Sequence, residues 1–226
     1  MTTPTIGLDG ILILVNNHHM RRGKFIVIDG MDGSGKSTEM RLMKKELAGT
    51  SAVFTHEPGG TRRGEEIRKM LLARSGKQSS VSDFFLFWAA RAMHVGEVIA
   101  PALRAGENVI SDRFDASTFA YQIIADKNPR LTELFHKCRR AVLGECMPDA
   151  YIFLDLPISI SKARISGDSS KRSRYDMKPA AYHKAVRRGF KEFGPATHSK
   201  VFIVDGSRSP DEVHKDVWQI VRKILL

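Results

Sequence analysis

The chain has 226 residues, 42% of them hydrophobic and 27% charged, which predicts one globular domain and excludes a disordered chain. Its 36 Lys and Arg against 25 Asp and Glu give a formal net charge of +11, which leaves two classes open, a nucleic-acid binder or a protein with a site for small polyanions. No apolar run approaches the ~20 residues of a membrane span, and the two cysteines form no C-x-x-C pair, so we expect reduced thiols, a cytoplasmic location and no membrane partner.

Residues 1–22 show no sustained periodicity and contain a polar cluster at 16–19. We expect an N-terminal extension that is disordered, or sequence ahead of the true initiator, for which Met20 is the candidate. Residues 23–226 are expected to form the domain.

From Lys24 onward, short β-rich apolar runs alternate with segments of helical spacing. This alternation predicts a parallel sheet with helices on both faces. The expected strands are 25–28, 52–54, 108–111, 151–154 and 200–204, and the expected helices include 37–47, 64–72 and 83–103. The polar, Ser-rich and basic run SGDSSKRSRYDMK at 166–178 predicts a mobile surface loop.

The segment GMDGSGKS at 30–37 fits the phosphate-binding pattern G-x-x-x-x-G-K-[ST], between an expected strand and an expected helix. Its glycines let successive amides point at phosphate oxygens, and the helix adds its positive N-terminal end. We expect Lys36 at the β- and γ-phosphates and the Ser37 hydroxyl on Mg²⁺. A Gly-rich turn that binds nothing is the alternative, which the flanking elements disfavour. The residues expected to bind ATP are Gly30, Met31, Asp32, Gly33, Ser34, Gly35, Lys36, Ser37 and Thr38.

A P-loop of this kind occurs in GTPases, motor ATPases and small-molecule kinases. The chain has no Asn-Lys-x-Asp element, which GTPases use to specify the base, and none of its expected strands ends in the paired acids of a motor ATPase. The remaining class is a small-molecule kinase.

Further motifs follow the P-loop in a fixed order. The second expected strand runs into THEPGGT at 55–61, and the third ends in SDRFD at 111–115, followed by STFAYQ at 117–122. FWAAR at 87–91 lies between them, and a Pro-Asp pair at 148–149 leads into LDL at 154–156. In these motifs the chain resembles the thymidylate kinase family over essentially all of 24–226.

The resemblance implies a P-loop NTPase fold: a three-layer α/β sandwich with a five-stranded parallel sheet, helices on both faces and a mobile lid at about 164–178. It implies an enzyme that phosphorylates dTMP to dTDP with ATP and Mg²⁺, in dTTP biosynthesis, as a homodimer. Lid closure would bring cations to the transferring phosphate and exclude water. The lid cations are Arg164, Lys171, Arg172 and Arg174.

The resemblance also implies roles for single residues. Arg68 would grip the acceptor phosphate, Phe87 would stack on thymine and Arg91 would bond the thymine O4. Asp32 would contact the deoxyribose, and Asp112 would hold Mg²⁺ through water. The expected catalytic residues are Lys36, Asp32, Arg113, Arg172 and Arg174. The expected acceptor-binding residues are Glu57, Pro58, Arg68, Phe87, Arg91, Arg113, Ser117, Thr118, Tyr121 and Gln122, and the expected metal ligands are Ser37 and Asp112.

Several of these positions could instead have a purely structural role. Arg68 could be a solvated helix cation, Phe87 a core residue, and Asp32 and Glu57 turn or capping residues. We expect the basic pairs 44–45, 139–140 and 187–188 to lie on solvated helix faces. No aromatic and basic stacking platform is present, which argues against a nucleic-acid partner.

Two departures from the family pattern leave a relaxed or different base specificity as the alternative function. His56 stands where many relatives have Arg, and the Gly-Arg-Gly turn that follows the Tyr-Gln pair in the family is missing after Gln122.

Overall fold

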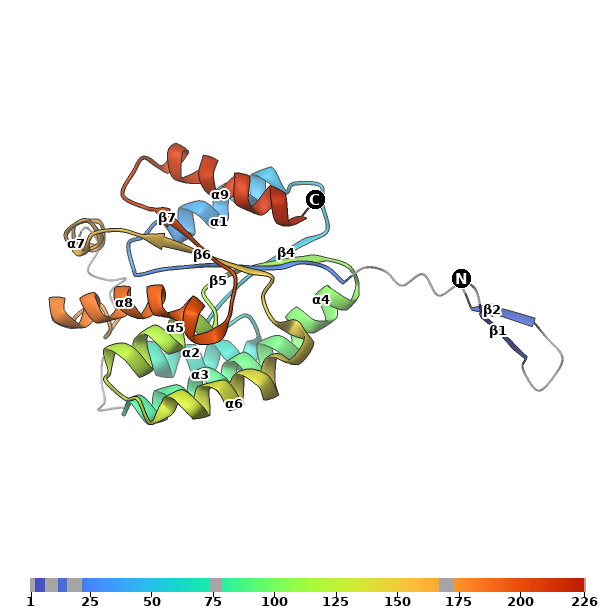
Figure 1. The fold of residues 1–226 in the computed structure, drawn as a ribbon, viewed down its shortest axis with the longest axis horizontal. Coiled ribbons are helices and arrows are strands. Elements are labelled where there is room, and N and C mark those ends of the chain that lie inside the picture. Colours follow the sequence, from blue (N-terminus) through green and yellow to red (C-terminus); the bar gives the residue numbers. More distant parts are fainter. Residues whose placement is uncertain (1–2, 7–11, 16–21, 74–78, 167–172, 226) are drawn as a thin grey trace.

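The structure, a computed structural model, describes residues 3–6, 12–15, 22–73, 79–166 and 173–225. Its centre is a five-stranded parallel sheet in the order β4-β5-β3-β6-β7 (Figure 1). The strands are β3 Phe25–Asp29, β4 Ala52–His56, β5 Asn108–Asp112, β6 Ala150–Asp155 and β7 Val201–Asp205. The predicted fold class and all five predicted strands are confirmed.

The sheet order places β3 in the middle, and every residue of β3 is buried. A central strand of a parallel sheet is covered on both faces, so a continuous apolar run is the sequence that fits it. Ile26 of β3 pairs with Ile110 of β5 on one side and with Ala150 of β6 on the other. The carboxyl ends of these parallel strands therefore meet at one edge of the sheet, where ligands of such folds bind.

Helices cover both faces of the sheet (Figure 1). One layer contains α1 and α9, and its core includes Met43 and Val217. The other layer is larger, and its core includes Trp88, Phe135 and Phe193. The bounds are α1 Lys36–Glu46, α2 Arg62–Leu72, α3 Ser80–His94, α4 Ala100–Arg104, α5 Asp115–Thr118, α6 Leu131–Leu143, α7 Ile158–Ser166, α8 Ala180–Thr197 and α9 Pro210–Leu225.

The helix predicted over 83–103 is continuous but not uniform. It begins three residues earlier, because the Ser79 side chain accepts a hydrogen bond from the Ser82 amide and caps α3. A π-helical segment, η1 Val95–Ile99, then joins α3 to α4. A second π-helical segment, η2 Phe119–Ala125, follows α5, and a short 3₁₀ turn, η3 Gly144–Cys146, follows α6.

Near the N-terminus, β1 Thr3–Ile6 and β2 Leu12–Val15 form an antiparallel pair that Figure 1 shows apart from the body of the protein. The sequence pattern did not predict this pair, and the assignment of 1–22 as an extension stays a prediction. In the part of the chain that the structure describes, no helix is long and apolar enough to span a bilayer.

The predicted solvated face is wrong for Arg139. This side chain is buried, and its Nε donates to Oδ2 of Asp115 at 2.7 Å. Asp115 is fully buried and also accepts from the Tyr151 hydroxyl at 2.6 Å. A carboxylate in the core needs such partners, since an unpaired buried charge is strongly unfavourable. Arg187 likewise pairs with Asp155, whereas Arg140, Arg188, Lys44 and Lys45 are exposed as expected.

Candidate active site

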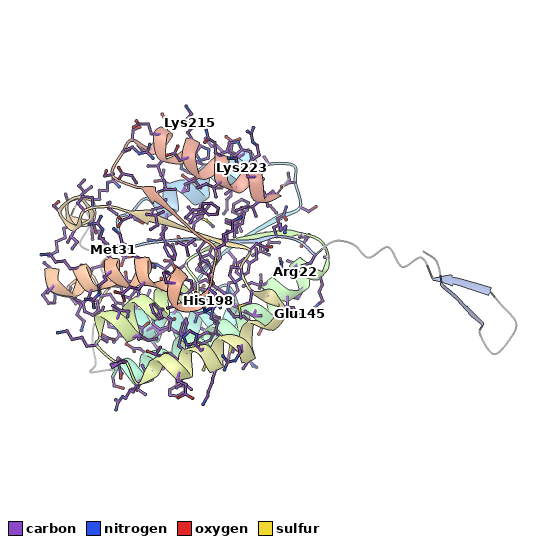
Figure 2. All side chains as sticks on the ribbon, viewed as in Figure 1. Arg22, Met31, Glu145, His198, Lys215 and Lys223 are labelled. Atoms are coloured by element: carbon purple, nitrogen blue, oxygen red, sulfur yellow. The ribbon has the colours of Figure 1, made fainter. Side chains whose placement is uncertain are left out.

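The P-loop connects β3 to α1 at the carboxyl edge of the sheet. Gly30 and Gly33 have φ angles of 145° and 73°, and a Cβ would lie 2.7 Å from the Leu154 carbonyl oxygen at Gly30 and 2.8 Å from that of Ser161 at Gly33. Only glycine fits both constraints. Figure 2 shows Met31 of this loop at the end of the molecule opposite Arg22 and Glu145.

Lys36 is the first residue of α1, and its side chain folds back over the P-loop. Its Nζ donates to the carbonyl oxygens of Gly30 at 3.1 Å and Met31 at 2.9 Å. Burial lowers the pKa of Lys36, and the nearby Arg113 lowers it further. The amine therefore lies within the phosphate cradle, and its partners among the described residues are two neutral carbonyls and, weakly, the Ser34 hydroxyl at 3.5 Å.

Arg113, directly after β5, reaches across to the P-loop. Its φ of 70° is rare for a residue with a side chain. Its Nη1 donates to the Gly30 carbonyl oxygen at 2.9 Å, and its Nη2 donates to Oδ1 of Asp32 at 2.5 Å. Burial alone would raise the pKa of Asp32, but Arg113 and Lys36 bring it down to about 2, so Asp32 is ionised at neutral pH.

Asp29, which ends β3, is a site residue that the sequence analysis missed. It is fully buried and accepts from the Ser117 hydroxyl at 2.9 Å, the Gly30 amide at 2.8 Å and Nη1 of Arg113 at 3.3 Å. Burial raises the pKa of Asp29 to about 6, against the opposing charges of Arg113 and Lys36. Asp29 thus joins the P-loop to the segment that follows β5.

Beside the P-loop lies a cavity of about 270 Å³. Asp32 and Arg113 belong to its wall, so it opens directly onto the phosphate cradle. It brings together residues that the sequence analysis predicted from six separate segments: Asp32, Glu57, Pro58, Arg68, Phe87, Arg91, Asp112, Arg113, Ser117, Tyr121 and Gln122. It also includes His56, Leu72, Phe114, Ser173, Tyr175 and Asp176, for which no binding role was predicted.

Arg91 lines this cavity and is only 1% exposed. Its Nε and Nη2 contact Oε2 of Glu57 at 2.8 and 2.7 Å, and its Nη1 and Nη2 donate to the Thr118 hydroxyl at 3.2 and 3.3 Å. The guanidinium lies over the rings of Trp88 and Phe114, 4.7 and 5.2 Å from their centroids. Among the described residues, these contacts leave at least one of the five N–H groups of Arg91 for a ligand. Thr118, predicted to contact the base, lies behind Arg91 and is not among the lining residues.

A hydrogen-bonded chain supports Glu57 from the other side. Oε1 of Glu57 lies 3.1 Å from Nδ1 of His94, and Nε2 of His94 lies 2.6 Å from the hydroxyl of Thr55. His94 is fully buried and was missed by the sequence analysis. Its position three residues after Arg91, on the same helix face, was the available signal.

Arg68 of α2 closes one side of the cavity. Its Nη1 donates to the Pro58 carbonyl oxygen at 2.7 Å. His56, in the position where many relatives have Arg, pairs with Glu65 at 2.8 Å and is half exposed at the rim.

The predicted lid residues have different surroundings. Arg164 lies on α7 and donates to the Gly206 carbonyl oxygen at 2.9 Å. Arg174 donates to Asp83, at the start of α3, at 2.5 Å. Lys171 and Arg172 lie outside the described residues. The predicted loop 166–178 is therefore in part a packed segment, since Tyr175 within it is 7% exposed.

Of the predicted metal ligands, Ser37 is exposed at the start of α1, and Asp112 ends β5 on the cavity wall. Oδ1 of Asp112 is buried and has no hydrogen-bond partner among the described residues. An oxygen of this kind, beside a phosphate cradle, fits a hard divalent cation that takes oxygen ligands.

Comparison with known proteins agrees with this geometry. The family profile described as thymidylate kinase matches residues 28–217. The thymidylate kinase of Symbiobacterium thermophilum is 40% identical over 204 residues, which cover 89% of this chain and 94% of that protein. The thymidylate kinase of Neisseria gonorrhoeae is 36% identical over 200 residues, which cover 88% and 96%.

A solved structure gives the same result at the level of the fold. The crystal structure of thymidylate kinase from Ehrlichia chaffeensis superimposes with a TM-score of 0.70 at 25% sequence identity, and the match covers 88% of this chain and 99% of that one. The sequence and the fold together show that this chain belongs to the thymidylate kinase family.

Proposed function

We propose that this protein is a dTMP kinase, which transfers the γ-phosphoryl group of ATP to dTMP and so serves dTTP biosynthesis. The observation that carries the proposal is the direct connection between the phosphate cradle and the cavity through Asp32 and Arg113. A donor on the P-loop and an acceptor in the cavity would meet at these two side chains. Phosphoryl transfer needs mainly such positioning, together with stabilisation of charge.

In this proposal, Lys36 and the P-loop amides hold the β- and γ-phosphates of ATP. Arg113 stands between donor and acceptor and stabilises the charge that develops on the transferring group. Arg68 holds the phosphate of dTMP, and ionised Asp32 accepts a hydrogen bond from a hydroxyl of the deoxyribose. Arg172 remains a predicted lid cation of the catalytic step.

The base of dTMP would lie deeper in the cavity. Phe87 offers a ring for stacking, and a remaining N–H of Arg91 can donate to the thymine O4. Tyr121 and Gln122 complete this wall. Thr118 acts through Arg91, because its hydroxyl accepts a hydrogen bond from the Arg91 guanidinium.

We infer that Mg²⁺ is the cofactor, held by the Ser37 hydroxyl and, directly or through water, by Asp112. When bound there, Mg²⁺ would neutralise part of the charge of the ATP phosphates. The unpartnered Oδ1 of Asp112 supports this assignment.

The direct test is a panel of nucleoside monophosphates assayed with ATP and Mg²⁺ for the formation of ADP and of the diphosphate. We expect dTMP to be the best acceptor. Equal turnover of dCMP or dGMP would overturn the thymidylate assignment and leave the kinase fold and mechanism in place.

We also propose that the enzyme works as a cytoplasmic homodimer joined along α3. The outer face of α3 and the adjoining η1 exposes Phe85, Ala89 and Ala92 on α3 and Gly96 on η1, at spacings of three and four residues. The large apolar side chain of Phe85 is 52% exposed, and such exposed apolar surface is typical of a protein–protein contact. Small residues along the rest of the stripe let a second copy of the helix approach closely. Cys138 and Cys146 are free thiols, in agreement with a reducing compartment.

A further inference from the structure

Residues 173–178 form a compact turn beside the cavity. The backbone N–H and the hydroxyl of Ser173 both donate to Oδ2 of Asp176, at 2.7 and 2.8 Å, and the Asp176 amide donates back to the Ser173 carbonyl oxygen at 3.2 Å. These local bonds fix the shape of the turn, so its position relative to the helices depends on longer-range contacts.

Arg174 supplies two of those contacts. Its Nε donates to the Leu71 carbonyl oxygen at 2.8 Å, and its Nη2 donates to Oδ2 of Asp83 at 2.5 Å. Leu71 lies in the last turn of α2, where carbonyls have no partner within the helix, and Asp83 lies in the first turn of α3. One guanidinium therefore connects the turn to the ends of two helices. The side chains of Arg174 and Asp83 are 15% and 4% exposed, so solvent screens this pair little.

Tyr175 is the side chain that this connection places in the cavity wall. Its hydroxyl donates to Oδ2 of Asp83 at 3.0 Å and accepts from Nη2 of Arg174 at 2.9 Å and from Nε2 of Gln122 at 3.4 Å. One donor and two acceptor sites are all that a phenol offers, so its capacity is fully used. The ring meets that of Tyr121 edge-on, with centroids 5.5 Å apart.

Arg174 differs from its neighbours in sequence in its position relative to the cavity. Ser173, Tyr175 and Asp176 line the cavity, and Arg174, between them in sequence, does not. Its guanidinium instead bonds to the two helices that carry the acceptor-binding residues: Arg68 on α2, and Phe87 and Arg91 on α3. We propose that Arg174 is a positioning residue, which assembles the acceptor-side wall by joining Tyr175 to α2 and α3 and does not contact the transferring phosphate. This assignment rests on the proposed dTMP kinase function.

Steady-state kinetics of Arg174→Ala test the proposal. We expect the KM for dTMP to rise ~10-fold or more, with the KM for ATP within ~2-fold and kcat within ~3-fold of wild type. Arg174→Lys keeps the charge but lacks the planar fork that reaches both acceptors, so we expect an intermediate KM for dTMP. Arg188→Ala, which removes a 65% exposed arginine from α8, is the matched control and should match wild type.

Asp83, the ion-pair partner of Arg174, provides a second test. Asp83→Ala should raise the KM for dTMP as Arg174→Ala does, and the double variant should be no worse than the more affected single variant. A fall in kcat with an unchanged KM for dTMP in Arg174→Ala would overturn the proposal, because that pattern belongs to a contact made in the transition state.

Hydrogen exchange without nucleotide gives a readout that is independent of activity. In Arg174→Ala the amides of the last turn of α2 and the first turn of α3 should exchange faster, while those of β3 keep their wild-type rates. Unchanged exchange at both helix ends would overturn the proposal. Should wild type fail to phosphorylate dTMP, the proposed function falls and the exchange experiment alone decides the role of Arg174.

Discussion

At the scale of single residues, the cations of the site bond to acceptors of their own chain. Lys36 donates to two P-loop carbonyls, and Arg113 donates to one of these carbonyls and to Asp32. A nucleotide phosphate offers a charged acceptor in place of a neutral carbonyl, and charge-assisted hydrogen bonds are roughly twice as strong. Both side chains are therefore ordered near the place where phosphate binds, and their ordering adds little to the entropic cost of binding.

Lys36→Ala should reduce kcat by about 10³-fold, or about 4 kcal/mol, because a donor at the transferring phosphates is lost from the transition state. The fold should persist, since the amine bonds mainly to carbonyls of a loop whose glycines set its shape. The measurement is single-turnover phosphorylation of dTMP, with thermal unfolding beside it. Lys45→Ala, at an exposed position on the same helix, is the control and should match wild type. Turnover of Lys36→Ala within tenfold of wild type would contradict the P-loop assignment.

Arg91 should determine the choice of base. The guanidinium is a donor only, so it favours the O4 acceptor of thymine or uracil over the N4 amino group of cytosine. We expect dTMP to be the best acceptor, dUMP to be weaker because it lacks the methyl contact, and dCMP to be poor. The measurement is kcat/KM for the three nucleotides. In Arg91→Ala the ratio of dTMP to dCMP should narrow as overall activity falls.

The same substitution tests the buried pair with Glu57. Glu57 is only 4% exposed in wild type, and Arg91→Ala leaves this buried carboxylate with His94 but without its guanidinium; removing one partner of a buried pair typically costs about 3–5 kcal/mol. Denaturant unfolding should show a loss of that size. Glu57→Gln with Arg91→Ala should recover part of it, because the double variant removes the buried charge that has lost its guanidinium. An unchanged free energy of unfolding in Arg91→Ala would mean that the pair adds nothing to stability.

At the scale of elements, the sequence could predict the features that depend on local pattern. It could not predict those that depend on contacts between residues far apart in the chain. The β3–P-loop–α1 unit was predictable because its signals are local: a buried apolar run, spaced glycines and a helix start. The strand ends carrying Asp112 and Arg113 were predictable for the same reason. Partners far apart in sequence were not, as the Arg139–Asp115 and Arg174–Asp83 pairs demonstrate. The π-helical segments η1 and η2 were also missed, because the helical spacing of apolar residues does not distinguish a π from an α segment.

The junction of β3 and the P-loop should make stability depend on pH through Asp29. Burial raises the pKa of this group from 3.8 to about 6 in the folded protein. Between these values the folded chain keeps a proton that the unfolded chain releases, so the contribution of Asp29 to stability is present below about pH 4 and is lost as the pH rises through about 6. Relative to Asp29→Asn, wild type should lose about 3 kcal/mol over this window.

Urea unfolding of both proteins at several pH values from 4 to 7 measures this difference, and taking the difference removes the effects of other titrating groups. Ala48→Ser, at an exposed position after α1, changes no titratable group; it serves as the control and should show a flat difference. A flat difference for Asp29→Asn as well would show that its ionisation is not linked to folding.

At the scale of the whole molecule, the candidate active site and the proposed dimer contact lie on different parts of the fold. The carboxyl edge carries the P-loop, Arg113 and the cavity, whereas the outer face of α3 and η1 carries the stripe of Phe85, Ala89, Ala92 and Gly96. The same helix presents Phe87 and Arg91 to the cavity. A dimer along α3 would therefore support the acceptor wall from behind, and a substitution on the outer face tests the two together.

Ala92→Glu places a charge in the middle of this stripe. If two copies pack along α3, the charge must lose its water at the interface, and like charges approach one another across the two-fold axis, so the dimer should dissociate. Light scattering after size-exclusion chromatography should show the mass of a dimer for wild type and of a monomer for Ala92→Glu. Ala48→Glu, the same change at an exposed position after α1, should remain dimeric. The monomeric variant should also bind dTMP more weakly, since Phe87 and Arg91 lose the support behind them, while ATP binding at the P-loop stays near wild type. A wild-type monomer would contradict the proposed dimer. An Ala92→Glu variant that remains dimeric would show that the contact lies elsewhere.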